Sequence, residues 1–510
     1  MYPGVHAATH PDRPALIMAG SGRRLTYREL DERSLRLANQ LRAAGLGKGD
    51  VVALLSDNSP EAFEVYWAAL RSGLYVCAVN SHLQPEEVAY IVNDSGASAL
   101  LVSAGLAELA EAVAEQVTVG LRLAFGGAVP GFDDYEEALA AASTEVPASQ
   151  PCGADLLYSS GTTGRPKGIK PNLPDRQVHE PGNVLVDLLS AFYGFTEDTV
   201  YLSPAPVYHA APLRYSASVH AIGGTVVMME RFDPEGALRA IEEYGITHSQ
   251  WVPTMFVRML KLDEQIRQRY DLSSHRMAVH AAAPCPVEVK RAMIEWWGPI
   301  LQEYYAATEG IGMTLIDSAQ WLDKPGSVGR SVLGEVHICD EGGRELPSGE
   351  VGTVYFGRDE VPFEYLGDPD KTRSVKHPEH GNWATVGDLG YVDDDGFLFL
   401  TDRKAFMIIS GGVNIYPQEV ENVLVLHPAI LDVAVFGVPD AEMGEAVKAV
   451  VQPAPGAEPG PDLEREILDY ARQRVAHYKV PRSVDFASEL PRTPTGKLVK
   501  GKLKARYAPS

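Results

Sequence analysis

The chain has 510 residues, of which 45% are hydrophobic and 22% charged, and its formal net charge is −23. At about 150 residues per domain, this length predicts roughly three domains or sub-domains with ordinary globular cores. The acidic excess disfavours general binding to nucleic acid or anionic membranes, and four cysteines without a C-x-x-C pair disfavour a disulfide scaffold or a zinc finger.

The N-terminal segment, MYPGVHAATHPDRPALIM, has no basic start followed by an apolar core, so we do not expect a signal peptide. No stretch approaches the roughly 20 uninterrupted apolar residues of a membrane-spanning helix. These features predict a cytoplasmic enzyme with no transmembrane segment.

The first hundred residues alternate between helix and strand signals. Thr26-x-x-Glu29 is a capping box that predicts the start of a helix, and Gly45 predicts its end. The unbroken apolar run 51–56 is typical of a strand covered on both faces. The pattern continues with helices from Pro60 and Pro85 and with strands at 75–80 and 98–103. Such alternation predicts a parallel sheet wrapped by helices.

The pattern of helix and strand signals changes twice beyond this region. Residues from about 330 to 400 carry alternating strand and turn signals, as in GEVGTVYFGR, which predict a β-rich portion. After TDRK at 401–404 we expect a hinge and a smaller unit with a helix at 417–427, strands at 429–437 and 446–452, and a helix at 462–476. The predicted fold class is α/β: a large N-terminal domain of helix-wrapped sheets with a β-rich portion, followed by a small α+β domain.

The loop YSSGTTGRPKGI at 158–169 is the strongest local signal. The backbone N–H groups of a loop rich in glycine and hydroxyl residues can surround an anion, and Lys167 adds a positive charge. Lys167 is followed by Gly168 rather than by Ser or Thr, so the loop is not a Walker A motif. Surface turns favour the same residue types, and the loop alone leaves both interpretations open.

Three further motifs are weak when taken singly. In YYAATEG, Tyr305 offers a flat face to a base, Thr308 offers a hydroxyl to a phosphate, and Glu309 is a hard oxygen ligand for Mg²⁺. A Thr-Glu pair more often starts a helix, however. Asp388 in VGDLG can accept hydrogen bonds from vicinal hydroxyls, although Asp is common in turns. Lys497 lies in a basic tail, for which a solvated face is the default interpretation.

The order and spacing of these motifs resemble the adenylate-forming superfamily of acyl-CoA synthetases, non-ribosomal adenylation domains and firefly-type luciferases. The resemblance runs from about Arg24 to Leu503 and rests on YSSGTTGRPKG, YHAAP, YYAATEG, VGDLGYVDDDGFLFLTDR, SGGVNIYPQEVE and LPRTPTGK. It implies an AMP-binding domain at 1–402 and a mobile C-terminal domain at 403–510. It also implies two half-reactions: a carboxylate attacks the α-phosphate of ATP to give acyl-AMP, and a thiol then takes the acyl group.

The resemblance further implies roles for individual residues. Lys497 is expected to bridge the carboxylate and the α-phosphate, His209 to lie beside the reacting carboxylate, and Thr308 and Glu309 to bind a phosphate oxygen and Mg²⁺. Tyr305 is expected to stack on adenine, and Asp388 and Arg403 to hold the ribose. The other residues expected to bind the nucleotide or CoA are Ser160, Gly161, Thr162, Thr163, Gly164, Lys167, Ala282, Ala283, Gly411 and Gly412.

The chain departs from the family pattern at three positions. Ala306 and Val386 replace a glycine and a threonine, and Ala405 replaces the charged residue usual at the hinge. We hypothesise that Ala405 leaves the two arrangements of the C-terminal domain closer in energy.

By position, the resemblance implies that Trp251, Ala281 and Pro284 border the acid, while packing in the core is an equally good interpretation of such apolar residues. The small side chains of Ala281, Ala282 and Ala283 leave volume for a wide acid. No Asp or Arg stands out there, so an apolar acyl chain, an aryl acid or an alicyclic acid is expected. HPEH at 377–380 is expected to be a solvent-facing turn rather than a metal site.

The leading functional prediction is an AMP-forming acyl-CoA synthetase, an acid–thiol ligase that uses ATP, Mg²⁺ and CoA and exists as a monomer or homodimer. An alternative keeps the adenylation but passes the acyl group to a carrier-protein thiol in trans or to an amine. A luciferase-like oxygenase has no sequence feature in its favour. A catalytically silent paralogue has only Ala306 and Ala405 in its favour.

Overall fold

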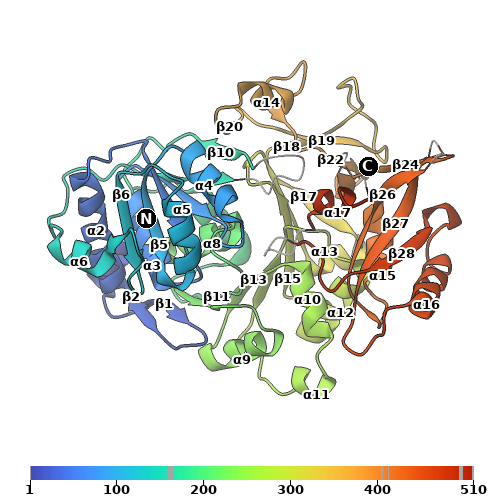
Figure 1. Cartoon of the computed structure of the whole chain (residues 1–510), viewed down its shortest axis with the longest axis horizontal. Coiled ribbons are helices and arrows are strands. Elements are labelled where there is room, and N and C mark those ends of the chain that lie inside the picture. The colour runs from blue at the N-terminus through green and yellow to red at the C-terminus, as the bar shows by residue number, and fades with distance from the viewer. Residues whose placement is uncertain are drawn as a thin grey trace.

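The computed structural model describes residues 2–158, 166–403, 406–411, 413–440, 442–492 and 498–507, apart from the side chains of Arg403 and Lys502. Figure 1 shows parallel strands and helices of the N-terminal half on the left, and a separate sheet formed by the end of the chain on the right. Within the described residues, no helix combines the length and the apolar character needed to cross a membrane.

The first sheet is parallel throughout and confirms the alternation expected for the first hundred residues. Its strands, in spatial order, are β7 (Asp133–Asp134), β6 (Leu121–Phe125), β5 (Ala97–Ser103), β3 (Val51–Leu55), β4 (Tyr75–Val79) and β8 (Ala154–Asp155). The helices that alternate with them are α2 (Tyr27–Ala43), α3 (Pro60–Leu70), α4 (Pro85–Asp94), η1 (Ala104–Leu106), α5 (Ala107–Ala114) and α6 (Tyr135–Ala141).

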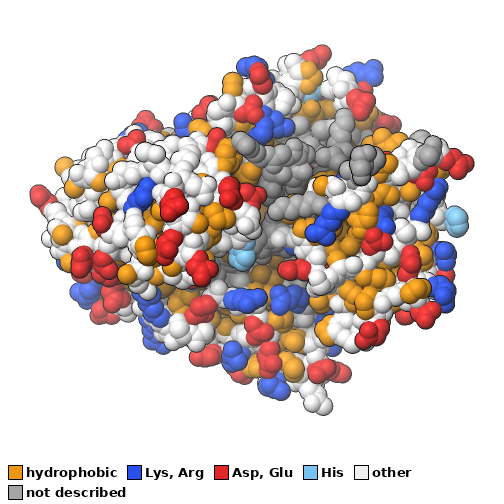
Figure 2. Space-filling view, viewed as in Figure 1, with side chains coloured by type: hydrophobic (Ala, Val, Ile, Leu, Met, Phe, Trp, Pro, Cys, Tyr) orange, Lys and Arg blue, Asp and Glu red, His pale blue; other side chains and the backbone are white. Residues whose placement is uncertain are grey.

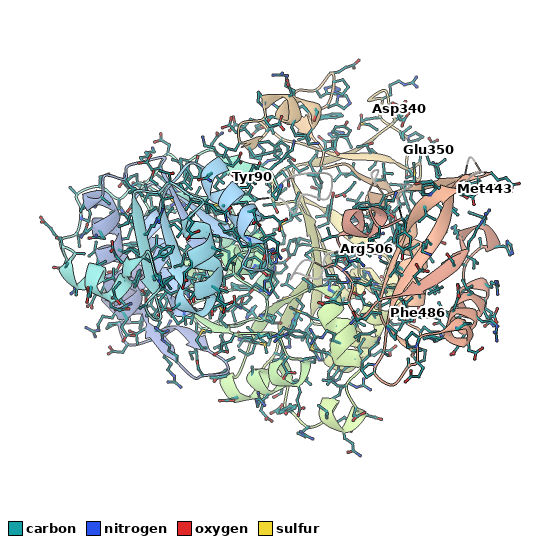
Figure 3. All side chains as sticks on the ribbon, viewed as in Figure 1. Tyr90, Asp340, Glu350, Met443, Phe486 and Arg506 are labelled. Atoms are coloured by element: carbon teal, nitrogen blue, oxygen red, sulfur yellow. The ribbon has the colours of Figure 1, made fainter. Side chains whose placement is uncertain are left out.

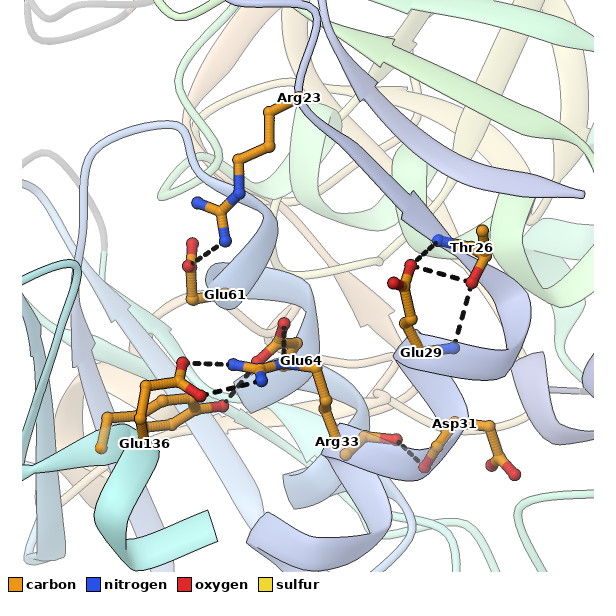
Figure 4. Close-up of polar contacts among 10 residues, drawn as sticks. Arg23, Thr26, Glu29, Asp31, Arg33, Glu61, Glu64 and Glu136 are labelled. Atoms are coloured by element: carbon orange, nitrogen blue, oxygen red, sulfur yellow. Dashed lines mark hydrogen bonds and ion pairs between the residues drawn. The ribbon is translucent and has the colours of Figure 1, made fainter. Parts of the chain in front are cut away.

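Local polar contacts fix the first of these helices (Figure 4). The Thr26 hydroxyl accepts a hydrogen bond from the Glu29 N–H at 3.2 Å, and the Glu29 carboxylate accepts one from the Thr26 N–H at 2.8 Å, which completes the capping box. Arg33 of α2 donates to the fully buried Glu64 of α3 at 2.7 Å and to Glu136 of α6 at 2.6 Å. One guanidinium therefore joins three helices, and it compensates a carboxylate that burial would otherwise leave costly.

The second sheet is the longest and changes direction along its length. In spatial order it runs β18 (Glu335–Cys339), β19 (Gly352–Gly357), β22 (Asp388–Val392), β23 (Leu398–Arg403), β17 (Ser327–Leu333), β16 (Met313–Asp317), β15 (Leu301–Ala306), β14 (Met277–His280), β13 (His248–Trp251), β11 (Val200–Ser203), β12 (Thr225–Met228), β1 (Pro14–Met18) and β2 (Arg24–Thr26), with β21 (Trp383–Ala384) beside β19. Strands β1 and β11 to β15 pair in parallel, whereas β15 and β16 begin the antiparallel part. This antiparallel part confirms the β-rich portion expected at 330–400.

Helices cover both faces of this sheet and build separate cores on either side of it. They are α1 (Pro3–Thr9), α7 (Val184–Tyr193), α8 (Ala210–Ile222), α9 (Pro234–Tyr244), α10 (Pro253–Leu260), α11 (Glu264–Arg267), α12 (Val287–Trp297) and α13 (Ser318–Asp323), whereas α14 (Pro369–Ser374) packs beside strand β20 (Phe363–Tyr365). A short third sheet of β9 (Leu157–Tyr158), β10 (Gly168–Pro171) and β20 (Phe363–Tyr365) lies above them in Figure 1.

The fourth sheet contains only strands that follow residue 403. Its strands are β25 (Val413–Ile415), β24 (Ile408–Ser410), β27 (Gly444–Pro453), β26 (Ile430–Asp440) and β28 (Ser483–Phe486). The helical segments of this region are α15 (Pro417–Leu424), α16 (Pro461–Arg472), η2 (His477–Lys479) and α17 (Lys500–Lys504). The expected α+β composition is confirmed, while the hairpin β24–β25, strand β28 and helix α17 had not been predicted.

Candidate functional site

A cleft of about 2910 Å³ lies between the two large sheets and the C-terminal sheet. Figure 2 shows the hollow near the centre of the visible face, with acidic and basic side chains scattered around it rather than gathered in one patch. The cleft lies beyond the carboxyl ends of parallel strands β11, β13 and β14, where open α/β sheets bind their ligands.

Strand β15 divides this cleft because successive side chains of a strand point to opposite faces. On one face, Glu303 and Tyr305 are directed toward the side of α12 and β22, where their hydrogen-bond partners lie. On the other face, Tyr304 stacks on Tyr215 of α8, with ring centroids 5.9 Å apart. All four side chains line the cleft.

The face with Tyr305 has the features expected of a nucleotide site. The Tyr305 hydroxyl donates a 2.6 Å hydrogen bond to the Asp388 carboxylate, which brings the expected adenine and ribose residues into contact. Asp388 is paired with Arg403 across the antiparallel strands β22 and β23. Two motifs more than eighty residues apart in the chain thus meet at one wall of the cleft, as the resemblance implies.

The loop after β14 forms the neighbouring wall. Ala282 adopts a positive φ of 76°, a conformation that is uncommon for a residue with a Cβ. Ala282, Ala283 and Pro284 all line the cleft. Non-glycine residues in this strained conformation cluster at ligand sites, so the outlier supports a binding role for this loop.

A buried ion pair supports the floor of this face. Lys290 of α12 is fully buried and donates to Glu303 at 2.6 Å, while His280 lies 3.6 Å from the same carboxylate oxygen. Burial raises the pKa of Glu303, and the Lys290 ammonium opposes that shift. Burial and the nearby ammonium hold the pKa of His280 well below its usual range, so His280 is neutral at physiological pH.

Thr308 and Glu309 lie in the turn after β15 and border the same cleft. The Tyr365 hydroxyl donates to one Glu309 carboxylate oxygen at 2.9 Å and fixes the direction of the side chain. A carboxylate held at the wall of this cleft has the hard oxygen chemistry that Mg²⁺ requires. The residue therefore fits the expected metal ligand.

Lys167 forms a 2.5 Å ion pair with Asp368 at the edge of the cleft. The ammonium lowers the pKa of the Asp368 carboxyl, which also accepts a hydrogen bond from the Lys371 N–H. Sequence reasoning had not identified Asp368, because an Asp at the start of a helix ordinarily serves as an N-cap, as this one also does.

On the other face of β15, His209 is the N-cap residue of α8 and lines the cleft. Arg214 follows on the same helix and forms an ion pair of 2.7 Å with Asp155 of β8. Both charged residues line the cleft, whereas the segments 251–256 and 281–286, which were expected to help line the acid pocket, contain no Asp or Arg. The sequence did not reveal the pair because its members are separated by a helix and several strands.

Two of the three residues expected to border the acid occupy other positions. Trp251 is 1% exposed and packs in a core with Phe256 and Trp297. Ala281 is likewise buried, and neither residue lines the cleft, whereas Pro284 does. Trp251 is the last residue of β13, and its side chain points to the face of the sheet that is covered by α10 and α12.

The HPEH segment is exposed at Pro378, Glu379 and His380, as expected of a solvent-facing turn, but His377 is buried. His377 is 3% exposed, its Nε2 lies 2.7 Å from the Gly343 carbonyl oxygen, and its Nδ1 accepts hydrogen bonds from the N–H groups of Glu379 and His380. Because its Nδ1 accepts, Nε2 carries the proton and donates to the Gly343 oxygen. His377 is thus a buried structural histidine at the start of an otherwise exposed turn.

One side of the C-terminal unit faces the cleft. The cleft is lined there by Arg492, Leu498 and Lys500, whereas Gly411 does not line it. Gly411 donates its N–H to the Met443 carbonyl at 2.8 Å, and Figure 3 places Met443 at the outer edge of the molecule while Arg506 lies toward the centre. Several predicted residues lie outside the described parts of the chain, namely Ser160, Gly161, Thr162, Thr163, Gly164, Ala405, Gly412 and Lys497.

Comparison with protein families gives two matches along the chain. The model for the AMP-binding enzyme family matches residues 5–366, and the model for the AMP-binding enzyme C-terminal domain matches residues 419–497. The first match alone covers well over half of the chain.

Curated relatives extend over almost the whole length. The chain is 36% identical to a feruloyl-CoA synthase of Amycolatopsis sp, with 99% of this chain and 98% of the relative covered. It is 31% identical to the long-chain-fatty-acid–CoA ligase FadD13 of Mycobacterium tuberculosis, with 98% and 97% covered.

Solved structures share the same arrangement. The amide bond synthetase McbA from Marinactinospora thermotolerans matches with a TM-score of 0.81 at 29% identity, covering 99% of this chain and 100% of McbA. The o-succinylbenzoate CoA synthetase of Bacillus subtilis, solved with its acyl-adenylate intermediate, matches with a TM-score of 0.80 at 27% identity, with 98% and 97% covered. The chain therefore belongs to the AMP-binding enzyme family, as an adenylate-forming enzyme of the acyl-CoA synthetase kind.

Proposed function

We propose that this acyl-CoA synthetase uses ATP to convert a carboxylic acid to an acyl-adenylate and then transfers the acyl group to CoA. The observation that carries the proposal is the convergence of residues from distant motifs on one cleft. Lys167, Thr308, Glu309 and Asp388 border it on the phosphate and nucleotide side, and His209 borders it on the acid side.

In the first half-reaction, a carboxylate oxygen of the acid attacks the α-phosphorus, and the bond to the pyrophosphate oxygen breaks. Because both reactants are anionic, catalysis depends on positioning and on positive charge near the developing negative charge. Lys167 and residues 160–164 hold the β- and γ-phosphates, and Lys497 approaches the attacking carboxylate and the α-phosphate. Mg²⁺, held by Glu309, would neutralise phosphate charge.

The nucleotide itself is held by the opposite wall. Tyr305 and the loop at Ala282 and Ala283 flank the adenine, while Asp388 and Arg403 hold the ribose hydroxyls. The bond between Tyr305 and Asp388 orients both groups before the nucleotide binds, so less conformational freedom is lost on binding.

In the second half-reaction, the CoA sulfur attacks the acyl carbon, the bond to the AMP oxygen breaks, and the thiol proton leaves to a base or to solvent. We propose that residues 1–402 and 403–510 act as separate domains and that the second rotates between the half-reactions. Rotation would replace the side carrying Lys497 with the side carrying Gly411 and Gly412. His209, at the start of α8, would lie where the thiol meets the acyl group.

An acceptor other than CoA is the specific alternative, because the names of two similar proteins indicate that a group other than CoA receives the acyl unit. One is named a fatty acid–[acyl-carrier-protein] ligase, from Streptomyces coeruleorubidus, and is 31% identical to this chain. Another is the amide bond synthetase McbA. A carrier-protein thiol or an amine could therefore take the place of CoA in the second step.

The test is an incubation of the protein with ATP, Mg²⁺ and a panel of aliphatic, aryl and alicyclic acids, with and without CoA, followed by mass spectrometry. Formation of acyl-CoA and AMP supports the proposal. Acyl-AMP that persists in the presence of CoA would contradict CoA as the acceptor. Repeating the incubation with an added amine or a phosphopantetheinylated carrier protein would then identify the alternative.

A further inference from the structure

Arg214 is a charged residue on the acid side of the cleft, and the proposed reaction does not use it. It lies in α8, about 7 Å further along the helix axis than His209 at 1.5 Å per residue. The cleft-lining residues one turn before and after it on the helix are all small, namely Ala210, Ala211, Ala217 and Ser218. The guanidinium therefore stands in a space that its neighbours leave open.

The contacts of Arg214 define which kind of group it can still bind. Its Nε and Nη2 atoms lie 2.9 and 2.7 Å from one oxygen of Asp155, and Nη1 lies 3.4 Å from the Thr308 carbonyl oxygen. A guanidinium has five N–H donors, so these contacts leave part of its donor capacity for a ligand. The side chains of Arg214 and Asp155 are 28% and 13% exposed toward the cleft.

The charges of Arg214 and Asp155 further restrict which chemical group of the acid can bind beside them. Asp155 already balances the positive charge of Arg214, so a second carboxylate on the acid would add an uncompensated negative charge beside Asp155. A neutral oxygen can accept a hydrogen bond from the guanidinium without that penalty. A hydroxyl, ether or carbonyl oxygen therefore suits this place better than an anion.

The walls around Arg214 are aromatic. Tyr304 and Tyr215 stack at an interplanar angle of 19°, and the Tyr304 hydroxyl accepts a 2.9 Å hydrogen bond from Gln250. Tyr66 and Trp67 of α3 line the cleft beyond the ion pair. Flat rings pack well against a planar ligand, whereas a flexible chain gains less from such walls.

We infer that the acid is a planar ring acid that carries a neutral oxygen substituent, and that Arg214, positioned by Asp155, donates a hydrogen bond to that oxygen. This inference rests on the proposed adenylation. It assigns to Arg214 a role in choosing the acid and none in binding the nucleotide, since no described nucleotide-side residue other than Thr308 contacts it.

The experiment measures pyrophosphate release for benzoate, 4-hydroxybenzoate, cinnamate, 4-hydroxycinnamate, terephthalate and octanoate. For the unaltered protein we expect the hydroxylated acids to have the highest kcat/KM, with terephthalate below the unsubstituted ring acids. Arg214→Met should lower the ratio of kcat/KM for hydroxylated over unsubstituted acids by about tenfold to a hundredfold, the range for a hydrogen bond to a charged group. Asp155→Asn should improve the use of terephthalate relative to 4-hydroxybenzoate, because it leaves Arg214 with unbalanced charge.

Arg239→Met is the matched control. Arg239 is an exposed arginine of α9 that does not line the cleft, so the same substitution there should leave the ratio unchanged. A thermal unfolding curve for each variant excludes loss of folded protein. Equal kcat/KM for hydroxylated and unsubstituted acids, or a ratio unchanged by Arg214→Met, would overturn the inference while leaving the adenylation intact. Absence of pyrophosphate release with every acid would instead overturn the proposed function on which the inference depends.

Discussion

The two faces of β15 meet the same cleft with different chemistry. On one face Glu303 and Tyr305 are fixed by hydrogen bonds to Lys290 and Asp388, and these partners come from α12 and β22. On the other face Tyr304 lies against an aromatic ring of α8 and near a neutral ion pair. A single strand can thus offer a rigid polar wall for the proposed nucleotide site and an aromatic wall for the proposed acid site, because adjacent residues point in opposite directions.

Because the two faces of β15 differ, we expect substitutions on them to change different properties of the protein. The nucleotide face depends on buried charge, whose disruption costs several kcal/mol, whereas the acid face depends on single hydrogen bonds and ring contacts that cost less. We therefore expect changes on the first face to affect folding or ATP binding, and changes on the second to affect the choice of acid.

The largest effect is expected from Lys290→Met. It leaves the buried Glu303 carboxylate without its partner, and breaking such a pair costs about 3–5 kcal/mol of folding free energy. Urea unfolding monitored by tryptophan fluorescence measures the loss. The double variant Lys290→Met with Glu303→Leu should recover most of the stability, and an equally unstable double variant would show that the pair is not the cause.

Lys497→Ala should have the next largest effect, because Lys497 is expected to act between the two faces. Removing a donor that stabilises transition-state charge costs roughly 3–4 kcal/mol, so the rate of adenylate formation should fall by about two to three orders of magnitude. Pyrophosphate release reports this step. The second step, started from chemically prepared acyl-AMP and CoA, should keep its rate, and a parallel loss there would contradict a role confined to adenylation.

Asp388→Ala tests the nucleotide face alone. Loss of a carboxylate that accepts hydrogen bonds from the ribose should raise the KM for ATP about tenfold to a hundredfold, while the KM for the acid stays the same. Tyr305→Phe is the matched control, since it removes the bond between Tyr305 and Asp388 but keeps the carboxylate. If the acid KM rises together with that for ATP in Asp388→Ala, the separation of the two faces is wrong.

The smallest effect is expected from Tyr304→Phe on the acid face. The variant keeps the ring stack on Tyr215 but loses the hydrogen bond from Gln250, worth about 0.5–1.5 kcal/mol. The KM for the preferred acid should rise by about two- to tenfold, with the KM for ATP unchanged. Steady-state kinetics with each substrate varied in turn measure the two KM values. A selective change in the KM for ATP would contradict the assignment of Tyr304 to the acid face.

The sequence allowed the repeating part of the fold to be predicted because its signals are local. Thr26 and Glu29 define a cap within one turn, and the apolar run at 51–56 corresponds to β3 at Val51–Leu55. The motif residues Thr308, Glu309 and Asp388 all border one cleft, which agrees with the single site that the order of the family motifs implied.

The acid region could not be predicted in the same way. Arg214 and Asp155 become partners only when α8 packs beside β8, and no spacing in the sequence links them. Trp251 was misplaced for a related reason: a residue at the end of a strand can face either the cleft or the core, and a one-residue difference reverses its side. Long-range pairing and strand facing therefore required the structure.

The ends of the segment that contains Lys497 are attached to the C-terminal unit by charge. Before it, Arg492 is paired with Asp432 of β26, with one contact at 2.6 Å. After it, Lys500 is 4% exposed and paired with Glu421 of α15 at 2.9 Å. If the C-terminal unit rotates as proposed, these two ion pairs, one half-buried and one buried, would make both ends of the segment move together with that unit. Removal of either ion pair should lower the rate of the first half-reaction more than that of the second, even though neither Arg492 nor Lys500 needs to contact ATP or the acid.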